Sequence, residues 1–170
     1  PNTPSDTLIQ FAKDEKYGVR VIVAEHINTP PDVLVELAAD KDQRVREAIA
    51  KNPNTQSGVL NQLAEDKNED IREEVPKNPN TQPSTLAILA DDKHYIVRKN
   101  VARNINTPPE VLTQLTADKD WLVRIEVAEN SNTPPYVLSQ LVADRSEMVR
   151  QRAICNQNQS SKLLNNILTG

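Results

Sequence analysis

The chain has 170 residues, 37% of them hydrophobic, and a formal net charge of −4 with charges of both signs mixed along it. The acidic balance argues against a general affinity for nucleic-acid phosphates, and a single cysteine excludes an intramolecular disulfide or a zinc site built on several cysteines. No apolar run reaches membrane-spanning length and no signal peptide is visible, so we expect a cytoplasmic location for what looks like a fragment, since Pro1 lacks a preceding methionine.

The dipeptide Asn-Thr recurs every 26 residues and opens six successive units. A fixed period of this length is typical of stacked supersecondary units rather than of one globular core. The sequence therefore predicts a single α-solenoid domain over residues 1–170, with repeats at 2–27, 28–53, 54–79, 80–105, 106–131 and 132–157 and a partial capping repeat at 158–170.

The first half of each unit predicts a helix. With Asn as position one, position two is threonine, usually followed by proline, and we expect the threonine to be the N-cap and the proline the first helical residue. Apolar residues at positions six, seven, ten and eleven lie on one helical stripe. Position seven is always leucine and is the predicted deepest contact between repeats: Leu8, Leu34, Leu60, Leu86, Leu112, Leu138 and Leu164.

The second half predicts a shorter antiparallel helix over positions fifteen to twenty-four, with positions eighteen and twenty-two buried. We expect this helix to end at an asparagine in the left-handed conformation, at Asn52, Asn78, Asn104, Asn130 and Asn156. In the third unit, Pro76 should kink or shorten it. In the partial unit, Leu163, Leu164, Ile167 and Leu168 are predicted to cap the stack.

Every full unit also carries an aspartate at position thirteen and an arginine six residues later. Because this charge pair recurs identically, we interpret it as architectural, with each arginine packed between repeats and bonded to the aspartate of its own or an adjacent unit. The members are Asp14, Arg20, Asp40, Arg46, Asp66, Arg72, Asp92, Arg98, Asp118, Arg124, Asp144 and Arg150.

The unit Asn-Thr-Pro-Pro-x-Val-Leu-x-x-Leu-Ala-x-Asp-x-x-x-x-Val-Arg-x-x-Val-Ala-x-Asn resembles the leucine-rich repeat variant family, with its best copies at 28–52, 106–130 and 132–150. The part Asp-x-x-x-x-Val-Arg is also similar to HEAT repeats. Both resemblances imply an all-α, right-handed stack of two-helix repeats, in which one helix of a pair can be partly 3₁₀, and a role in scaffolding or recognition without a common catalytic activity. An iron–sulfur segment, which accompanies some such repeats, needs several cysteines, so we expect no cofactor.

The variable positions of the second helices are the predicted partner-binding surface, because in HEAT-like stacks these helices line the concave side. Position sixteen is aromatic in Tyr17, Tyr95 and Trp121, and the last two should be neighbours about 10 Å apart. Two further interpretations stay open: the aromatics fill the turn between helices, and the polar positions form an ordinary solvated face. The predicted contact residues for a protein or peptide are Tyr95, Ile96, Lys99, Arg103, Trp121, Leu122, Ile125 and Glu129.

We expect no enzyme activity, no catalytic residues and no metal site, since His26 and His94 have no companions and Cys155 stands alone. One alternative is a solenoid that binds nucleic acid, which the acidic charge disfavours. Another is an accessory protein for cofactor or chromophore handling, for which Glu73, Glu74, His94 and Cys155 are dispersed candidates. Self-association through an uncapped apolar face at the first repeat is a further expectation.

Overall fold

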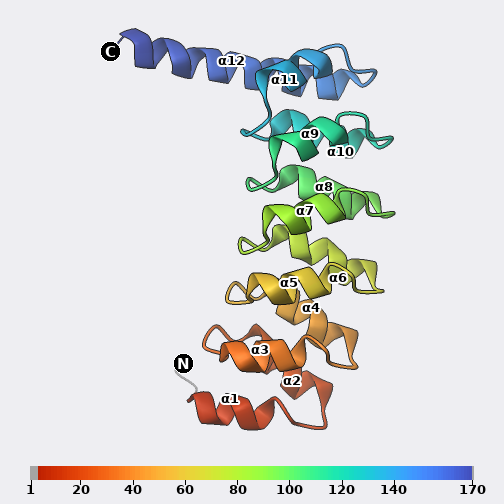
Figure 1. Cartoon of the computed structure of the whole chain (residues 1–170), viewed down its shortest axis with the longest axis vertical. Helices are drawn as coiled ribbons and strands as arrows, with labels where there is room; N and C mark the ends of the chain where they lie inside the picture. The colour runs from red at the N-terminus through yellow and green to blue at the C-terminus, as the bar shows by residue number, and fades with distance from the viewer. Residues whose placement is uncertain (1–3, 170) are drawn as a thin grey trace. The chain divides into compact units, whose positions relative to one another are not determined.

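A computed structural model describes the backbone of residues 4–169 and the side chains of residues 4–158. Over this range the chain is helical and contains no strand. The chain divides into two compact units, residues 1–89 and 90–170, and the division falls inside the fourth 26-residue repeat. Figure 1 labels the helices of both units.

Unit 1 contains three complete helix pairs and the first helix of a fourth. The first helices are α1 (Ser5–Phe11), α3 (Pro31–Leu37), α5 (Ser57–Leu63) and α7 (Pro83–Leu89), and the second helices are α2 (Tyr17–Glu25), α4 (Gln43–Lys51) and α6 (Glu69–Glu74). The second helices pack side by side, α2 on α4 and α4 on α6, and first helices pack against that layer. The unit is thus two layers deep (Figure 1).

Unit 2 repeats this arrangement. It consists of α8 (Tyr95–Arg103), α9 (Pro109–Leu115), α10 (Trp121–Glu129), α11 (Pro135–Leu141) and α12 (Glu147–Thr169). The second helices α8, α10 and α12 form one layer with α10 in the middle, and α9 and α11 pack against it. The 26-residue spacing of the sequence therefore matches the spacing of the helix pairs, and the prediction of an α-solenoid repeat is confirmed.

The core follows the predicted apolar positions. The position-seven leucines from Leu8 to Leu138 are at most 2% exposed and belong to the core, whereas the Leu164 side chain lies outside the described residues. Positions eighteen and twenty-two of the second helices are equally buried except for the half-buried Val19, as Val45 and Ile49 illustrate with 0% exposure. Burial therefore does not single out the leucines as the deepest contacts. Each helix therefore buries one stripe against its neighbours, at about 1.5–3 kcal/mol per fully buried large side chain.

The prediction that threonine is the helix N-cap is wrong. The N-cap residue of α3 is Pro30, and no side chain caps this helix. The Thr29 hydroxyl instead donates a hydrogen bond to the carbonyl of Val23, 2.5 Å away at the end of α2. Threonine at the same position bonds back in the same way to Ile49, Val101 and Val127. Because the helix starts two residues after the threonine, the hydroxyl ties the end of one repeat to the start of the next.

The prediction that an asparagine in the left-handed conformation ends the second helix is also wrong. Asn52 follows α4 with φ −68° and ψ 123°, which is extended, and no described residue has a positive φ. An extended residue directs its side chain toward the preceding repeat, where the asparagine finds partners that make a left-handed turn unnecessary.

Pro76 shortens its helix, as predicted. The α6 helix stops at Glu74 and is followed by a single 3₁₀ turn, η1 (Val75–Lys77), with proline at its second residue. Proline lacks the N–H that would continue the α-helical bonding. It is the only 3₁₀ segment in residues 4–169.

The second helix of the sixth repeat does not end at Asn156, which corrects the prediction. Instead α12 runs without interruption from Glu147 to Thr169. Residue 159, at the threonine position, is glutamine, so the hydroxyl that would bond back to the carbonyl of residue 153 is missing from the sequence. The side chains of the predicted capping residues, Leu163, Leu164, Ile167 and Leu168, lie outside the described residues.

Candidate partner-binding surface on the second helices

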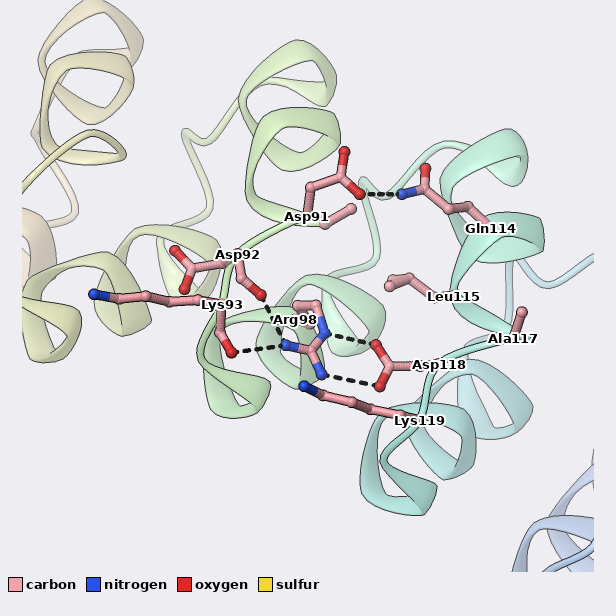
Figure 2. A pocket seen from close by; sticks show the side chains of 10 residues that line it. Asp91, Asp92, Lys93, Arg98, Gln114, Leu115, Ala117, Asp118 and Lys119 are labelled. Carbon is pink, nitrogen blue, oxygen red and sulfur yellow. Dashed lines mark hydrogen bonds and ion pairs between the residues drawn. The ribbon is translucent and has the colours of Figure 1, made fainter.

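The repeated arginines and aspartates hold neighbouring repeats together. In unit 2, Arg98 donates to both carboxylate oxygens of Asp118 in the next repeat, at 2.6 Å from Nε and 3.0 Å from Nη2 (Figure 2). Its Nη1 donates to the Asp92 carbonyl at 2.7 Å, within its own repeat. The same carboxylate pattern joins Arg20 to Asp40, Arg46 to Asp66 and Arg124 to Asp144. Among the residues whose side chains are described, Arg150 bonds only to its own repeat, and residue 170, the next position thirteen, is glycine.

The aspartates that bond these arginines have lowered pKa values. Burial alone would raise the pKa of Asp118, but the hydrogen bond from Arg98 and the backbone N–H of Asp120 outweigh burial and lower that pKa. The same balance lowers the pKa of Asp40, Asp66 and Asp144. A bidentate bond of this kind is charge-assisted and fixes the geometry of the two repeats.

A second set of bonds, which the sequence analysis missed, runs along the other end of the second helices. The Asn130 amide donates to the carbonyls of Ala102, at 2.7 Å, and Asn104, at 2.9 Å, both in the preceding repeat. Its Oδ1 accepts the backbone N–H of Asn132 at 2.9 Å. The corresponding asparagines that clamp onto the preceding repeat are Asn52, Asn78 and Asn156. The recurring Asn, Thr, Asp and Arg residues are thus occupied by repeat-to-repeat contacts.

The predicted contact residues differ in how accessible they are. Trp121 is 40% exposed, and Arg103 and Glu129 are also exposed. Tyr95, Ile96, Lys99 and Leu122 are half-buried. Ile125 is only 8% exposed, so its proposed role as an accessible contact is wrong: α10 lies between α8 and α12, and these helices cover the middle of it.

Part of the polar surface is paired within the chain. Lys99 on α8 lies 3.8 Å from the Glu126 carboxylate on α10, and Arg152 on α12 lies 2.8 Å from that of Glu129. Burial raises the pKa of Glu126, although the positive charges of Arg103 and Lys99 oppose the shift. The exposed polar residues of α8, α10 and α12 therefore include paired charges of opposite sign and not charges of one sign only.

An open hollow of about 470 Å³ lies where α10 and α12 begin. It is lined by Lys119, Trp121, Arg124, Arg145, Ser146 and Met148. Of these, only Trp121 was among the predicted contact residues. Position seventeen, which runs Ile96, Leu122 and Met148 in unit 2, is the signal in the sequence that could have pointed to the hollow.

Unit 1 has a different surface at the equivalent place. There the Arg44 guanidinium lies over the Tyr17 ring, 3.5 Å from its centroid, and bonds the Asp42 carboxylate at 2.8 Å. Hydrogen bonds from Arg44 are the main reason that the pKa of Asp42 falls to about 2. The aromatic ring is thus covered by a charge that the chain itself supplies.

In the described part of the chain, no group of three or more His, Cys, Asp or Glu side chains is placed to hold a metal ion. Among the described residues, no helix combines the length and the apolar character needed to cross a membrane.

The stacked helix pairs and their buried bridges define a helical repeat protein. Residues 17–42 and 96–120 match the sequence profile described as leucine rich repeat variant. A solved structure described as "a leucine-rich repeat variant with a novel repetitive protein structural motif" is 26% identical with a TM-score of 0.73, and the match covers 91% of this chain and 62% of that one. This chain thus spans less than two thirds of that protein. Two segments of this chain therefore match the leucine-rich repeat variant profile, and its fold is similar to that of a solved leucine-rich repeat variant.

More distant structures share the fold alone. The Escherichia coli protein YibA is 21% identical with a TM-score of 0.60, over 99% of this chain and 77% of YibA. A designed armadillo repeat protein is 14% identical with a TM-score of 0.53, over 91% and 99%. No curated protein gives a significant match.

Proposed function

We propose that this chain is a non-enzymatic module that holds a protein or peptide on the surface of its second helices. The observation that carries the proposal is that two different sets of repeat positions form the contacts between repeats and the exposed surface. The residues that recur in every unit bond one repeat to the next, and the exposed residues of the second helices are those that vary from unit to unit.

Two exposed apolar side chains support a protein partner in particular. Trp121 is 40% exposed and Met148 is 51% exposed, although both lie on helices whose opposite faces are fully buried. Large apolar and aromatic groups on a rigid helical frame are typical anchors of protein interfaces, whereas solvated surfaces favour charged residues.

We call the recurring arginines and aspartates that join one repeat to the next the frame. The positions of the frame arginines argue against binding of nucleic acid. Arg20, Arg98 and Arg124 are each at most 6% exposed and are bonded to aspartates. They are therefore not available to phosphates, which would need several accessible cations along one track. The remaining charges on the second helices include acidic as well as basic groups.

Photo-crosslinking from single positions tests the proposal. A photoreactive phenylalanine analogue replaces either Trp121 or Arg103 on the second helices. Matched controls carry it at Glu110 or Tyr136, which are exposed on the first helices. Each variant is irradiated in an extract of the cells from which the sequence comes, once untreated and once after nuclease treatment.

We expect protein adducts of defined mass from the second-helix positions and none of these from the first-helix positions. The same adducts from both helix layers, or no protein adduct from any second-helix position, contradict the proposal. Adducts that disappear on nuclease treatment would show that the chain binds nucleic acid instead.

A further inference from the structure

Unit 2 carries an apolar patch at the start of its second helices that unit 1 lacks. We call it the Trp121 patch, and it comprises Tyr95, Ile96, Trp121, Leu122 and Met148 at positions sixteen and seventeen of three repeats. At these positions unit 1 has Tyr17, Gly18, Gln43, Arg44, Glu69 and Asp70. The frame does not require apolar groups here, because unit 1 builds the same helices with polar ones.

The patch is hollowed between two of its exposed members. Trp121 and Met148 line the open hollow of about 470 Å³ at the start of α10 and α12. Ligand sites commonly enclose roughly 300–1,000 Å³, so this hollow can seat a large apolar side chain and part of its backbone. Unlike Tyr17, Trp121 is not covered by a stacked arginine in the described structure.

The rim of the hollow is basic. Lys119 and Arg145 are both exposed, and the Lys119 ammonium forms no ion pair with any described residue. Arg145 donates from Nη2 to the neutral Lys119 carbonyl at 2.8 Å and forms no ion pair with any described residue, although the nearby Asp144 feels its charge. The third cation, Arg124, is neutralised by Asp144. Glu147, adjacent to Met148 in sequence, keeps its negative charge because its partner at 3.0 Å is the neutral Gln151 amide, but it does not line the hollow.

The net charges of the two units also favour an acidic partner at unit 2. Residues 1–89 contain ten basic and fifteen acidic residues, whereas residues 90–170 contain ten basic and nine acidic residues. An acidic segment is therefore repelled by the net negative charge of unit 1 but not by the slightly positive net charge of unit 2. Charge complementarity of this kind selects the partner and the docking site more strongly than it raises affinity.

We infer that the hollow binds an acidic peptide segment of a partner protein, with a large apolar side chain between Trp121 and Met148 and flanking carboxylates on Lys119 and Arg145. This inference rests on the proposed function and names the class of partner and the place where it binds. The apolar side chain supplies the anchor, and the carboxylates fix its orientation and its register along α10 and α12.

The test uses short random peptides displayed on phage and panned against the full chain. We expect enriched sequences in which Phe, Trp, Leu or Met lies next to Asp or Glu. A synthetic peptide of the consensus is then titrated against the wild type and two double variants, Trp121→Ala with Met148→Ser and Lys119→Glu with Arg145→Glu. Each should weaken binding about tenfold or more, and added salt should weaken the wild-type complex.

The chain provides a matched control for the charge reversal. Lys41 and Lys67 are exposed and occupy the same repeat position in unit 1 as Lys119 and Arg145 occupy in unit 2. The variant Lys41→Glu with Lys67→Glu changes the net charge equally and should bind the peptide as the wild type does. Far-UV circular dichroism of all three double variants checks that the helices remain.

Several outcomes overturn the inference. Consensus peptides without acidic residues, equal loss in the unit 1 control, or no loss in either unit 2 variant would each do so. Self-association abolished by the Trp121 variant would assign the hollow to a second copy, and binding of a single-stranded oligonucleotide lost on charge reversal would assign it to nucleic acid. If crosslinks still form at Arg103 while the unit 2 variants bind normally, only this inference fails. If no second-helix position gives protein adducts, the proposed function fails as well.

Discussion

Removing the aspartate of one buried arginine–aspartate pair should lower the free energy of unfolding by more than the loss of an exposed ion pair would. In Asp118→Ala, Arg98 loses the hydrogen bonds at 2.6 and 3.0 Å and keeps only those to the carbonyls of Asp92 and Lys93, at 2.7 and 3.2 Å. Arg98 is 6% exposed, so a charge remains buried without its counter-ion. Breaking a buried pair in this way typically costs about 3–5 kcal/mol. An open hollow of about 410 Å³ adjoins this pair and lets water screen it, so we expect the lower end, about 3 kcal/mol.

Urea unfolding followed by far-UV circular dichroism measures this cost. The variant Arg98→Met with Asp118→Ala should be less destabilised than the sum of its single changes, with a coupling energy of about 1–3 kcal/mol. The control is Arg44→Ala, because the Arg44–Asp42 pair is of the same type but Arg44 is 53% exposed, and it should change the midpoint little. A loss below about 1 kcal/mol for Asp118→Ala, or strict additivity in the double variant, would refute the assigned role of the pair.

Three further predictions concern the frame. Leu86→Ala should lower the free energy of unfolding by about 2–5 kcal/mol because Leu86 is 0% exposed, whereas Ile88→Ala on the same helix, at a residue 54% exposed, should leave the urea midpoint nearly unchanged. Asn130→Ala leaves the carbonyls of Ala102 and Asn104 without its amide and should cost about 1–3 kcal/mol. It should also speed amide hydrogen exchange at Asn132, whose N–H bonds to Asn130 Oδ1, and unchanged exchange there would argue against the clamp. The pKa values of Asp40, Asp66, Asp118 and Asp144 are lowered in the folded chain. The unfolded chain therefore binds more protons, and the free energy of unfolding should fall as the pH drops below about 4. A urea midpoint that rises on acidification would contradict this.

The repeat period and the apolar stripes were sufficient to predict the helix pairs, because burial at positions seven, eighteen and twenty-two depends on spacing alone. Leu60, Val97 and Ile71 illustrate this, each with 0% exposure. Pro76 was equally predictable, since the missing N–H acts locally whatever surrounds it.

The hydrogen-bond partners of recurring polar residues could not be predicted in the same way. Thr29 and Asn52 belong to residue types with strong local preferences as caps, but each bonds to a carbonyl of the preceding repeat. Those carbonyls come within reach only after the repeats stack. Local capping rules therefore fail where a nearby repeat offers a better partner.

The candidate surface was predictable in part for a related reason. The aromatic Trp121 stood out by residue type, whereas Met148 and Arg145 became meaningful only once α12 was placed beside α10. Ile125 was assigned to the surface by its variable position, but a central helix buries residues that an outer one would expose. A repeat position whose residue type varies is therefore one that does not bond neighbouring repeats together, but it can still be buried.

A titration of the isotope-labelled chain with the consensus peptide, followed by amide NMR shifts, tests the central claim most directly. Binding through variable residues of the second helices predicts shifts that concentrate at residues 119–123 and 145–149 in the patch at the start of α10 and α12. Shifts that concentrate on the first helices α9 and α11, or that follow the buried asparagine and arginine frame, would contradict the claim.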